Sequence, residues 1–153
     1  MDTDKKEIIW SCKPFSELTA GELFDILQLR SKVFVVEQNC AYQDPDHKDL
    51  VSWHLVGYCN QKPAAYSRLV PPEVSYSEVS IGRVLTSEDK RREGLGMKLM
   101  EESIQQIKIL YGECSIRISA QCYLIPFYEK WGFVSVGEPY LEDGIPHQEM
   151  LRS

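Results

Sequence analysis

Two long stretches of the chain carry apolar residues at helical spacing. The first follows Thr19 and Glu22, whose Thr-x-x-Glu spacing is a capping box that starts a helix. Its core-facing positions are Leu23, Phe24, Ile26, Leu27, Val33 and Phe34. The second covers residues 94–110. A shorter helix is predicted at 124–131, and it ends at Gly132, which suits a helix C-terminus.

Short runs of β-compatible residues lie between these helices and after them. Residues 53–59 and 64–70 are separated by the turn-forming residues 60–63, and this spacing predicts a β-hairpin. The second run ends before Pro71, because proline donates no ladder hydrogen bond. Residues 39–49 are rich in Asp, Asn, His and Pro, and we interpret them as a loop or a broken helix. Further strands are expected at 79–85, 115–121, 133–137 and 147–151.

The order of these elements predicts an α/β fold built on a mixed sheet. A helix comes first, antiparallel strands follow, and the chain then alternates strand, helix, strand, helix and final strands. The strands at 79–85 and 115–121 should be parallel neighbours, because the 94–110 helix is long enough to cross between them. Helices should cover both faces of the sheet. The sequence contains no internal repeat or Gly/Ser linker, so we expect residues 1–153 to form a single domain.

Composition limits the partners and the compartment. The formal net charge of −6 disfavours a nucleic-acid surface, because phosphate binding needs clustered Lys and Arg. No apolar run approaches the roughly 20 residues that span a bilayer, and no secretory h-region is visible, so we expect a cytoplasmic protein with no membrane partner. The odd cysteine count and the unpaired histidine spacing predict reduced thiols and no metal site. His54 lies inside a predicted strand and should be a hydrogen-bonded core histidine.

The segment from Ile81 to Gly96 carries the clearest chemical signal. A predicted strand leads into the basic residues 90–92, and Gly94 and Gly96 then open a helix. A helix N-terminus leaves backbone N–H groups unpaired, and glycine lets a phosphate approach the backbone closely. This predicts a phosphorylated ligand. The spacing fits neither G-x-G-x-x-G nor G-K-[S/T], which disfavours a Rossmann dinucleotide site and a P-loop.

Two sequence motifs lie on the consecutive helices predicted after residue 90. Residues 91–96, Arg-Arg-Glu-Gly-Leu-Gly, match [Q/R]-x-x-G-x-[G/A], and residues 127–133, Phe-Tyr-Glu-Lys-Trp-Gly-Phe, match F-Y-x-x-x-G-F. Both patterns resemble signatures of the GNAT N-acetyltransferase superfamily. The resemblance implies a GNAT-like acyl-CoA N-acyltransferase fold, a mostly antiparallel sheet with a splayed parallel central strand pair. Similarity to the ElaA-like branch extends to residues 29–38, 82–84 and 142–147.

The resemblance also implies where acetyl-CoA binds. The cosubstrate would lie in a split between the strands at 79–85 and 115–121. Backbone groups would hold it, so side-chain identity matters most at the glycines, where a Cβ would occupy ligand space. The pantetheine arm would contact Val84, Leu85 and Thr86, and the pyrophosphate would contact the segment containing Arg91, Arg92, Gly94, Leu95 and Gly96.

Catalytic residues follow from the same resemblance. Tyr128 stands where superfamily members often carry a tyrosine that protonates the departing CoA thiolate. Many members carry a glutamate base where this chain has Ser80, so the base must lie elsewhere. Glu37 is the first substitute and His147 the second, although Glu37 would also suit a structural pair with an arginine. Arg83 would either line the acceptor pocket and bind a carboxylate or form a structural ion pair.

These features imply an N-acetyltransferase. It would transfer acetyl from acetyl-CoA to a primary amine of a small molecule or peptide by direct attack in a ternary complex. The alternative is an acyl-CoA-binding module without turnover, serving as a sensor or assembly partner. Tyr128 favours the enzyme, and a homodimer is a family-level expectation.

Overall fold

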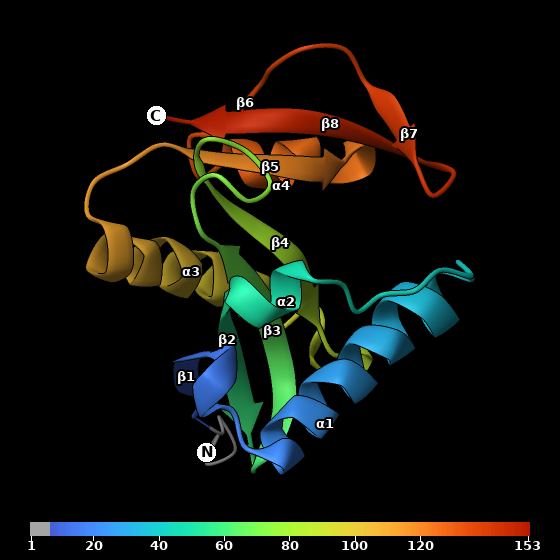
Figure 1. Ribbon diagram of the computed structural model, residues 1–153. Coiled ribbons are helices and arrows are strands. Elements are labelled where there is room, and N and C mark those ends of the chain that lie inside the picture. The colour runs from blue at the N-terminus through green and yellow to red at the C-terminus, as the bar shows by residue number, and fades with distance from the viewer. Residues whose placement is uncertain (1–6) are drawn as a thin grey trace, which may run out of the picture.

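The computed structural model describes residues 7–153 and forms from them an eight-stranded mixed sheet (Figure 1). The strand order is β1-β2-β3-β4-β5-β8-β6, and β7 also pairs with β8. Only the β4–β5 pair is parallel within these residues, so the predicted mixed sheet with one parallel pair is confirmed. The strands are β1 (Ile9–Pro14), β2 (Trp53–Cys59), β3 (Lys62–Val70), β4 (Val79–Thr86), β5 (Ile116–Gln121), β6 (Val134–Ser135), β7 (Tyr140–Glu142) and β8 (Ile145–Arg152).

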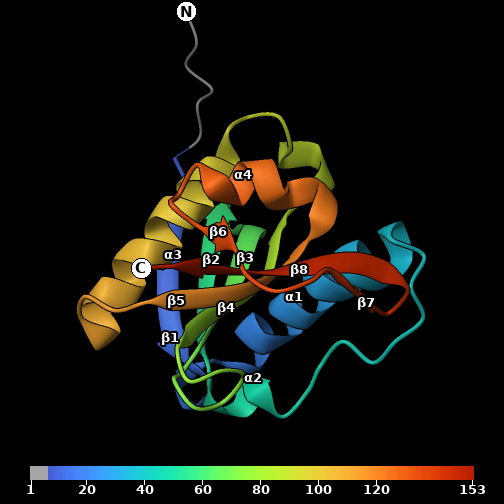
Figure 2. The same ribbon diagram turned by 90° about the horizontal axis from the view of Figure 1, so that it is seen from above.

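Helices cover both faces of the sheet, as predicted. Helices α1 and α2 lie on one face, and α3 and α4 lie on the other (Figure 2). None of the helices in residues 7–153 is long and apolar enough to cross a membrane. The α-helices are α1 (Ala20–Arg30), α2 (Lys48–Val51), α3 (Leu95–Tyr111) and α4 (Ile125–Glu129), and the other helical turns are η1 (Phe15–Glu17), the π-helix η2 (Ser31–Glu37), η3 (Glu88–Lys90) and η4 (Cys122–Leu124).

Strand alternation explains why the central strands hold helices on both sides. Successive side chains of a strand point to opposite faces, so neighbouring residues join different clusters. Val56 and Tyr66 pack with α1, whereas Leu55 and Ala65 pack with the first turns of α3. A further buried residue of β3, Leu69, joins a third cluster with residues of α3, so the apolar positions of β2 and β3 contribute to the packing of both helical layers.

The first helix begins where the capping box predicts. Thr19 Oγ1 accepts from the Glu22 backbone N–H at 3.1 Å, and the Glu22 carboxylate accepts from the Thr19 N–H at 2.9 Å. The predicted apolar stripe runs on to Phe34, but the hydrogen bonding changes at Ser31, where α1 passes into the π-helix η2. Such π-segments are rare and occur often at functional sites. This one ends at Glu37, one of the two candidate bases.

Two hairpins and one edge strand complete the sheet. Residues Asn60 and Gln61 form the turn between β2 and β3. Both adopt left-handed φ angles, of 51° and 64°, as the central residues of a two-residue hairpin turn do. The strands β1 and β7 were not expected from the sequence. β1 contains Lys13 and ends on Pro14, and both residues suit an edge strand better than a central one.

A buried polar network joins β2, β3 and the segment before them. His54 is 1 % exposed, and its Nε2 lies 2.9 Å from the Asp49 carbonyl oxygen. A carbonyl only accepts, so Nε2 carries the hydrogen, and Nδ1 accepts from the Tyr66 hydroxyl at 2.6 Å. The expectation of a hydrogen-bonded core histidine is confirmed.

This arrangement predicts a loss of stability in mild acid. Burial lowers the pKa of His54, and the hydrogen bond and charge of Asp49 only partly oppose that shift. The unfolded chain therefore takes up the proton first, and the free energy of unfolding should fall as the pH drops below about 6.5. His54→Gln should make that free energy less dependent on pH between about 7 and 5.5, where ordinary carboxylates remain ionised. Urea unfolding at several pH values measures this, and an unchanged pH dependence in the variant would contradict it.

Candidate active site

Strands β4 and β5 separate after a short parallel contact. Their pairing is restricted to Val79 with Ile116 and Ser80 with Arg117, although both strands continue well beyond these residues. The two strands diverge past this point (Figure 1). The open side of β4 therefore presents backbone groups that have no ladder partner among residues 7–153, and an extended ligand can pair with such groups.

A β-bulge lies on β4 at this split. Tyr66 pairs with Leu85 and Arg68 with Gly82, so one residue of β3 faces two residues of β4. Arg83, one of those two, has a φ of 50°, which is unusual for a residue other than glycine. Bulges and such backbone conformations concentrate beside functional sites. The bulge therefore marks this part of β4 as the wall of a site.

The turn before α3 forms a concave backbone surface at the end of the same strand. Arg92 and Gly94 adopt φ angles of 70° and 77°, and Lys98 N–H donates to the Gly94 carbonyl at 3.3 Å as the helix begins. A Cβ added to Gly94 would meet no atom within 4 Å, so the space beside it is open to a ligand. The first-turn N–H groups without an intrahelical acceptor are those of Leu95, Gly96 and Met97.

An ion pair connects the π-helix to this turn. Arg91 Nη2 donates to Glu37 Oε2 at 2.6 Å and to the Thr86 carbonyl at 3.1 Å. The pair is partly exposed, so it contributes at most about 1 kcal/mol to stability. It nevertheless fixes Glu37 against the loop that follows β4.

Tyr128 and the candidate residues on β4 line one cavity of about 800 Å³. Tyr128 is 6 % exposed on α4, and its ring stands edge-on to Phe127 and Phe133 at centroid distances of 5.2 and 6.1 Å. Burial raises the pKa of Tyr128, so its hydroxyl keeps its proton at neutral pH. A protonated hydroxyl on a residue that lines the cavity is able to donate to a departing anion.

Comparison with known proteins supports this geometry. Residues 54–153 match the family described as "Acetyltransferase (GNAT) domain". The chain belongs to the GNAT acetyltransferase family. The Escherichia coli (strain K12) protein ElaA is 41% identical over 147 residues, which cover 95% of this chain and 96% of ElaA.

Two solved structures of GNAT-type proteins extend this similarity to the whole fold. The crystal structure of Escherichia coli ElaA has a TM-score of 0.90 at 40% identity, covering 96% of this chain and 100% of that one. The crystal structure of an acyl-CoA N-acyltransferase from Pseudomonas aeruginosa has a TM-score of 0.92 at 43% identity, with the same coverage. The ElaA-like branch inferred from the sequence is therefore confirmed.

The GNAT fold binds acyl-CoA, and the residues of this split suit that ligand. The open backbone of β4 can accept an extended amide-containing arm, and the glycine turn leaves room for an anion beside free N–H groups. The Arg91 side chain donates to the Glu37 carboxylate and to the Thr86 carbonyl oxygen, so its guanidinium is already paired within the protein. The individual roles of Val84, Leu85, Thr86, Arg91, Arg92, Gly94, Leu95 and Gly96 stay predictions.

Arg83 lines the cavity and is also bound by carboxylates. Its Nε donates to Asp44 Oδ1 at 2.8 Å, and its Nη2 donates to the Asp44 carbonyl at 2.9 Å. Asp46 lies 3.5 Å from the same guanidinium. These carboxylates offset the positive charge of Arg83, which makes it a weak site for a substrate carboxylate. Its role towards an acceptor stays a prediction.

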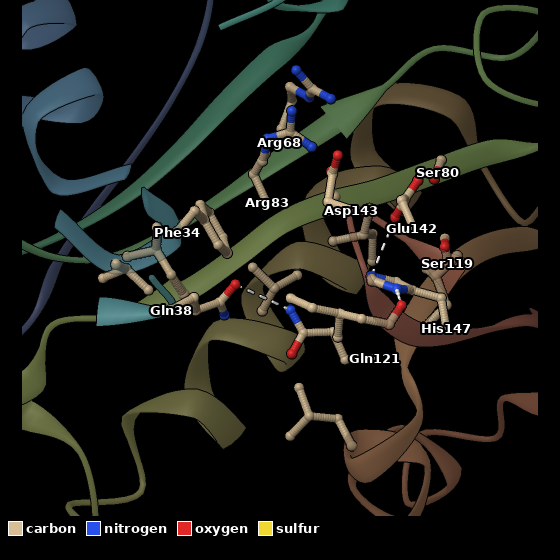
Figure 3. Close-up of a pocket in the computed structure, with 18 of the residues that line it drawn as sticks. Phe34, Gln38, Arg68, Ser80, Arg83, Ser119, Gln121, Glu142, Asp143 and His147 are labelled. Atoms are coloured by element: carbon tan, nitrogen blue, oxygen red, sulfur yellow. Dashed lines mark hydrogen bonds and ion pairs between the residues drawn. The ribbon is translucent and has the colours of Figure 1, made fainter. Parts of the chain in front are cut away.

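His147 lies on the opposite wall, on β8 directly across from Gln121 of β5. Figure 3 shows His147 close to Ser119 and Glu142, with Gln38 reaching Gln121 from the other side of the cavity. Ser80 also lines the cavity. Within residues 7–153 no group of three His, Cys, Asp or Glu side chains is placed to hold a metal ion.

Several residues of the cavity were not identified from the sequence. Gln38, Asp46, Gln121 and Glu142 belong to loops or strand ends, where polar residues are normally solvated. A weak signal was present, because residues 39–49 and 142–147 are both rich in acidic groups and histidine. That signal did not indicate that these loops meet at one cavity.

Proposed function

We propose that this protein transfers the acetyl group of acetyl-CoA to a primary amine of a small molecule or peptide, by direct attack in a ternary complex. The observation that carries the proposal is the continuity of one cavity from the β4–β5 split to Tyr128 and His147. A volume of about 800 Å³ is within the range of small-molecule sites and leaves room for a thioester and an acceptor together. The family description as an acetyltransferase supports acetyl as the transferred group.

Direct transfer requires a donor, an acceptor and two proton transfers. The open backbone of β4 and the turn at Gly94 would hold acetyl-CoA, so that its thioester lies near Tyr128. The amine nitrogen would then attack the thioester carbon, and the Tyr128 hydroxyl would donate to the sulfur as the C–S bond breaks. Tyr128 would recover a proton as the nitrogen of the intermediate loses one. The products are an N-acetyl amide and free CoA.

An amine panel with acetyl-CoA tests this function. We expect acetylated product, detected by mass spectrometry, together with an equal amount of free CoA thiol. Small amines, polyamines and peptides with a free N-terminus or lysine should be included, with a reaction lacking protein as the control for spontaneous transfer. Binding of acetyl-CoA with no acetylated amine in the panel would support the binding-module alternative instead.

A further inference from the structure

One pair of side chains on the acceptor wall has an unusual hydrogen-bond arrangement. His147 Nε2 lies 3.2 Å from Glu142 Oε2, and its Nδ1 lies 2.7 Å from the Ile145 carbonyl oxygen. Because a carbonyl only accepts, Nδ1 must carry a hydrogen. The Tyr140 ring lies beside the imidazole in a stacked orientation, with 6.1 Å between the ring centroids. This fixes the tautomer and directs Nε2 at the carboxylate.

A neutral His147 therefore places two acceptors side by side. With the hydrogen on Nδ1, Nε2 has a lone pair, and the Glu142 carboxylate beside it only accepts. Two acceptors at this distance need a donor between them, which is either a proton on Nε2 or a cationic N–H group. A primary ammonium has three such donors, so it can reach both atoms at once.

We propose that His147 Nε2 and Glu142 bind the ammonium group of the acceptor, and that His147 takes up the proton that this group must lose before the nitrogen attacks. This inference rests on the proposed amine transfer and names the base for it. Both side chains line the cavity that also contains Tyr128. Gln121, the partner of His147 in the β5–β8 pair, lies directly before η4 and α4, which carries Tyr128. The base and the acid therefore lie at the same end of β5.

The proton balance is simple. Only about one alkylamine molecule in 2,500 is neutral at pH 7, so most acceptors enter as ammonium ions. His147 Nε2 removes one proton, the nitrogen forms its bond to the thioester carbon, and a second nitrogen proton replaces the one that Tyr128 gives to the sulfur. His147 then releases its proton to water beside Glu142, whose side chain is 54 % exposed. The net products are an amide, CoA thiol and one proton.

Glu37 is less suited to this role. Its carboxylate accepts a hydrogen bond from the Arg91 guanidinium at 2.6 Å, so the oxygen is already occupied by a partner within the protein. Glu142 has only His147 as an ion-pair partner among residues 7–153. Glu149, which lies two residues after His147 on β8, pairs with Arg117 and does not line the cavity. Glu149 is therefore a matched control for Glu142.

Binding is tested first, without turnover. In a nuclear magnetic resonance titration, benzylamine hydrochloride should shift the ring signals of His147 in the wild-type protein. Benzyl alcohol and tetramethylammonium should shift them far less, because one lacks charge and the other lacks N–H donors. Glu142→Gln should weaken the benzylamine response, whereas Glu149→Gln should leave it unchanged. Equal responses to all three compounds, or no response, would overturn the proposal.

Turnover rates then distinguish a catalytic base at His147 from a histidine with a purely structural role. His147→Gln should slow acetylation of benzylamine by about 10²-fold or more, and should slow acetylation of O-benzylhydroxylamine, which is already neutral at neutral pH, by a much smaller factor. An equal decrease in the acetylation rate of both compounds would show that His147 is not the base. A larger decrease with benzylamine in Glu37→Gln than in His147→Gln would show the same. If the wild-type protein acetylates neither compound, transfer to these amines fails, and the titration still decides whether His147 and Glu142 bind ammonium.

Discussion

Replacing Tyr128 with phenylalanine should slow acetyl transfer by about 10²–10⁴-fold, while acetyl-CoA affinity stays close to that of the wild-type protein. The ring is buried between Phe127 and Phe133, so phenylalanine fills the same space and only the hydroxyl is lost. Burial raises the pKa of Tyr128, so the hydroxyl is a hydrogen-bond donor throughout the neutral range. Its loss leaves the departing thiolate without that donor.

Steady-state kinetics with a saturating amine measures this effect, and calorimetric titration measures the affinity. Tyr123→Phe is the matched control, because Tyr123 lines the same cavity but is 72 % exposed, and it should transfer acetyl at nearly the wild-type rate. A wild-type rate in the Tyr128 variant would show that another group, or water, protonates the sulfur.

Replacing Asp49 with asparagine should lower the free energy of unfolding by about 3–5 kcal/mol. Arg30 Nη1 donates to Asp49 Oδ1 at 2.6 Å, and Arg68 Nη1 donates to the same oxygen at 3.0 Å. Both arginine side chains are at most 4 % exposed. Burial alone would raise the pKa of Asp49, but the hydrogen bond and charge of Arg30 outweigh it and lower the pKa to about 2. Asparagine would leave two buried cations without their shared anion.

Asp46 provides the comparison for this variant. Its carboxylate also pairs with Arg68, at 2.7 Å, but it is 37 % exposed. Asp46→Asn should therefore cost about 1 kcal/mol or less. Urea unfolding at neutral pH compares the two variants. An equal decrease in the free energy of unfolding in the two variants would mean that burial does not determine how much each carboxylate contributes to stability.

Acid should weaken the same contact in the wild-type protein. The folded-state pKa of Asp49 lies below its value of 3.8 in an unfolded chain, so the stability from this carboxylate is complete above about pH 4. It is lost as the pH falls from there towards about 2. This pH range lies below the range in which His54 affects stability. Measurements of the free energy of unfolding at several pH values therefore distinguish the contributions of the two residues.

Local patterns predicted the central part of the fold well. The run 53–59 coincides with β2, and the capping box starts α1 at the expected place, because both depend on neighbouring residues. Strand β1 was missed because its existence depends on pairing with β2, which begins 39 residues after β1 ends (Pro14 to Trp53). Trp10 packs so closely on Gly57 that a Cβ there would lie 2.7 Å from the indole ring. Such a contact has no periodic signature within either segment.

In the site, too, features set by neighbouring residues could be predicted and features set by long-range contacts could not. The turn at Gly94 and the position of Tyr128 follow from short motifs, so sequence resemblance was enough to indicate them. The ion pair of Arg91 with Glu37 and that of Arg83 with Asp44 join residues far apart in the chain, and only the fold brings them together. The contact of His147 with Glu142 depends on the tight turn between β7 and β8. A sequence pattern shows that turn but not the direction of the side chains on it.

Calorimetric titration of acetyl-CoA into three proteins tests the central claim most directly: that the β4–β5 split and the turn at Gly94 hold an acyl-CoA. Gly94 and Gly137 both have positive φ angles, of 77° and 74°, and a Cβ at either meets no atom within 4 Å. Gly94→Glu and Gly137→Glu therefore carry a similar backbone cost of about 1–2 kcal/mol. We predict binding to the wild-type protein and to Gly137→Glu, and its loss in Gly94→Glu. Wild-type affinity in Gly94→Glu, or no binding to the wild-type protein, would contradict the claim.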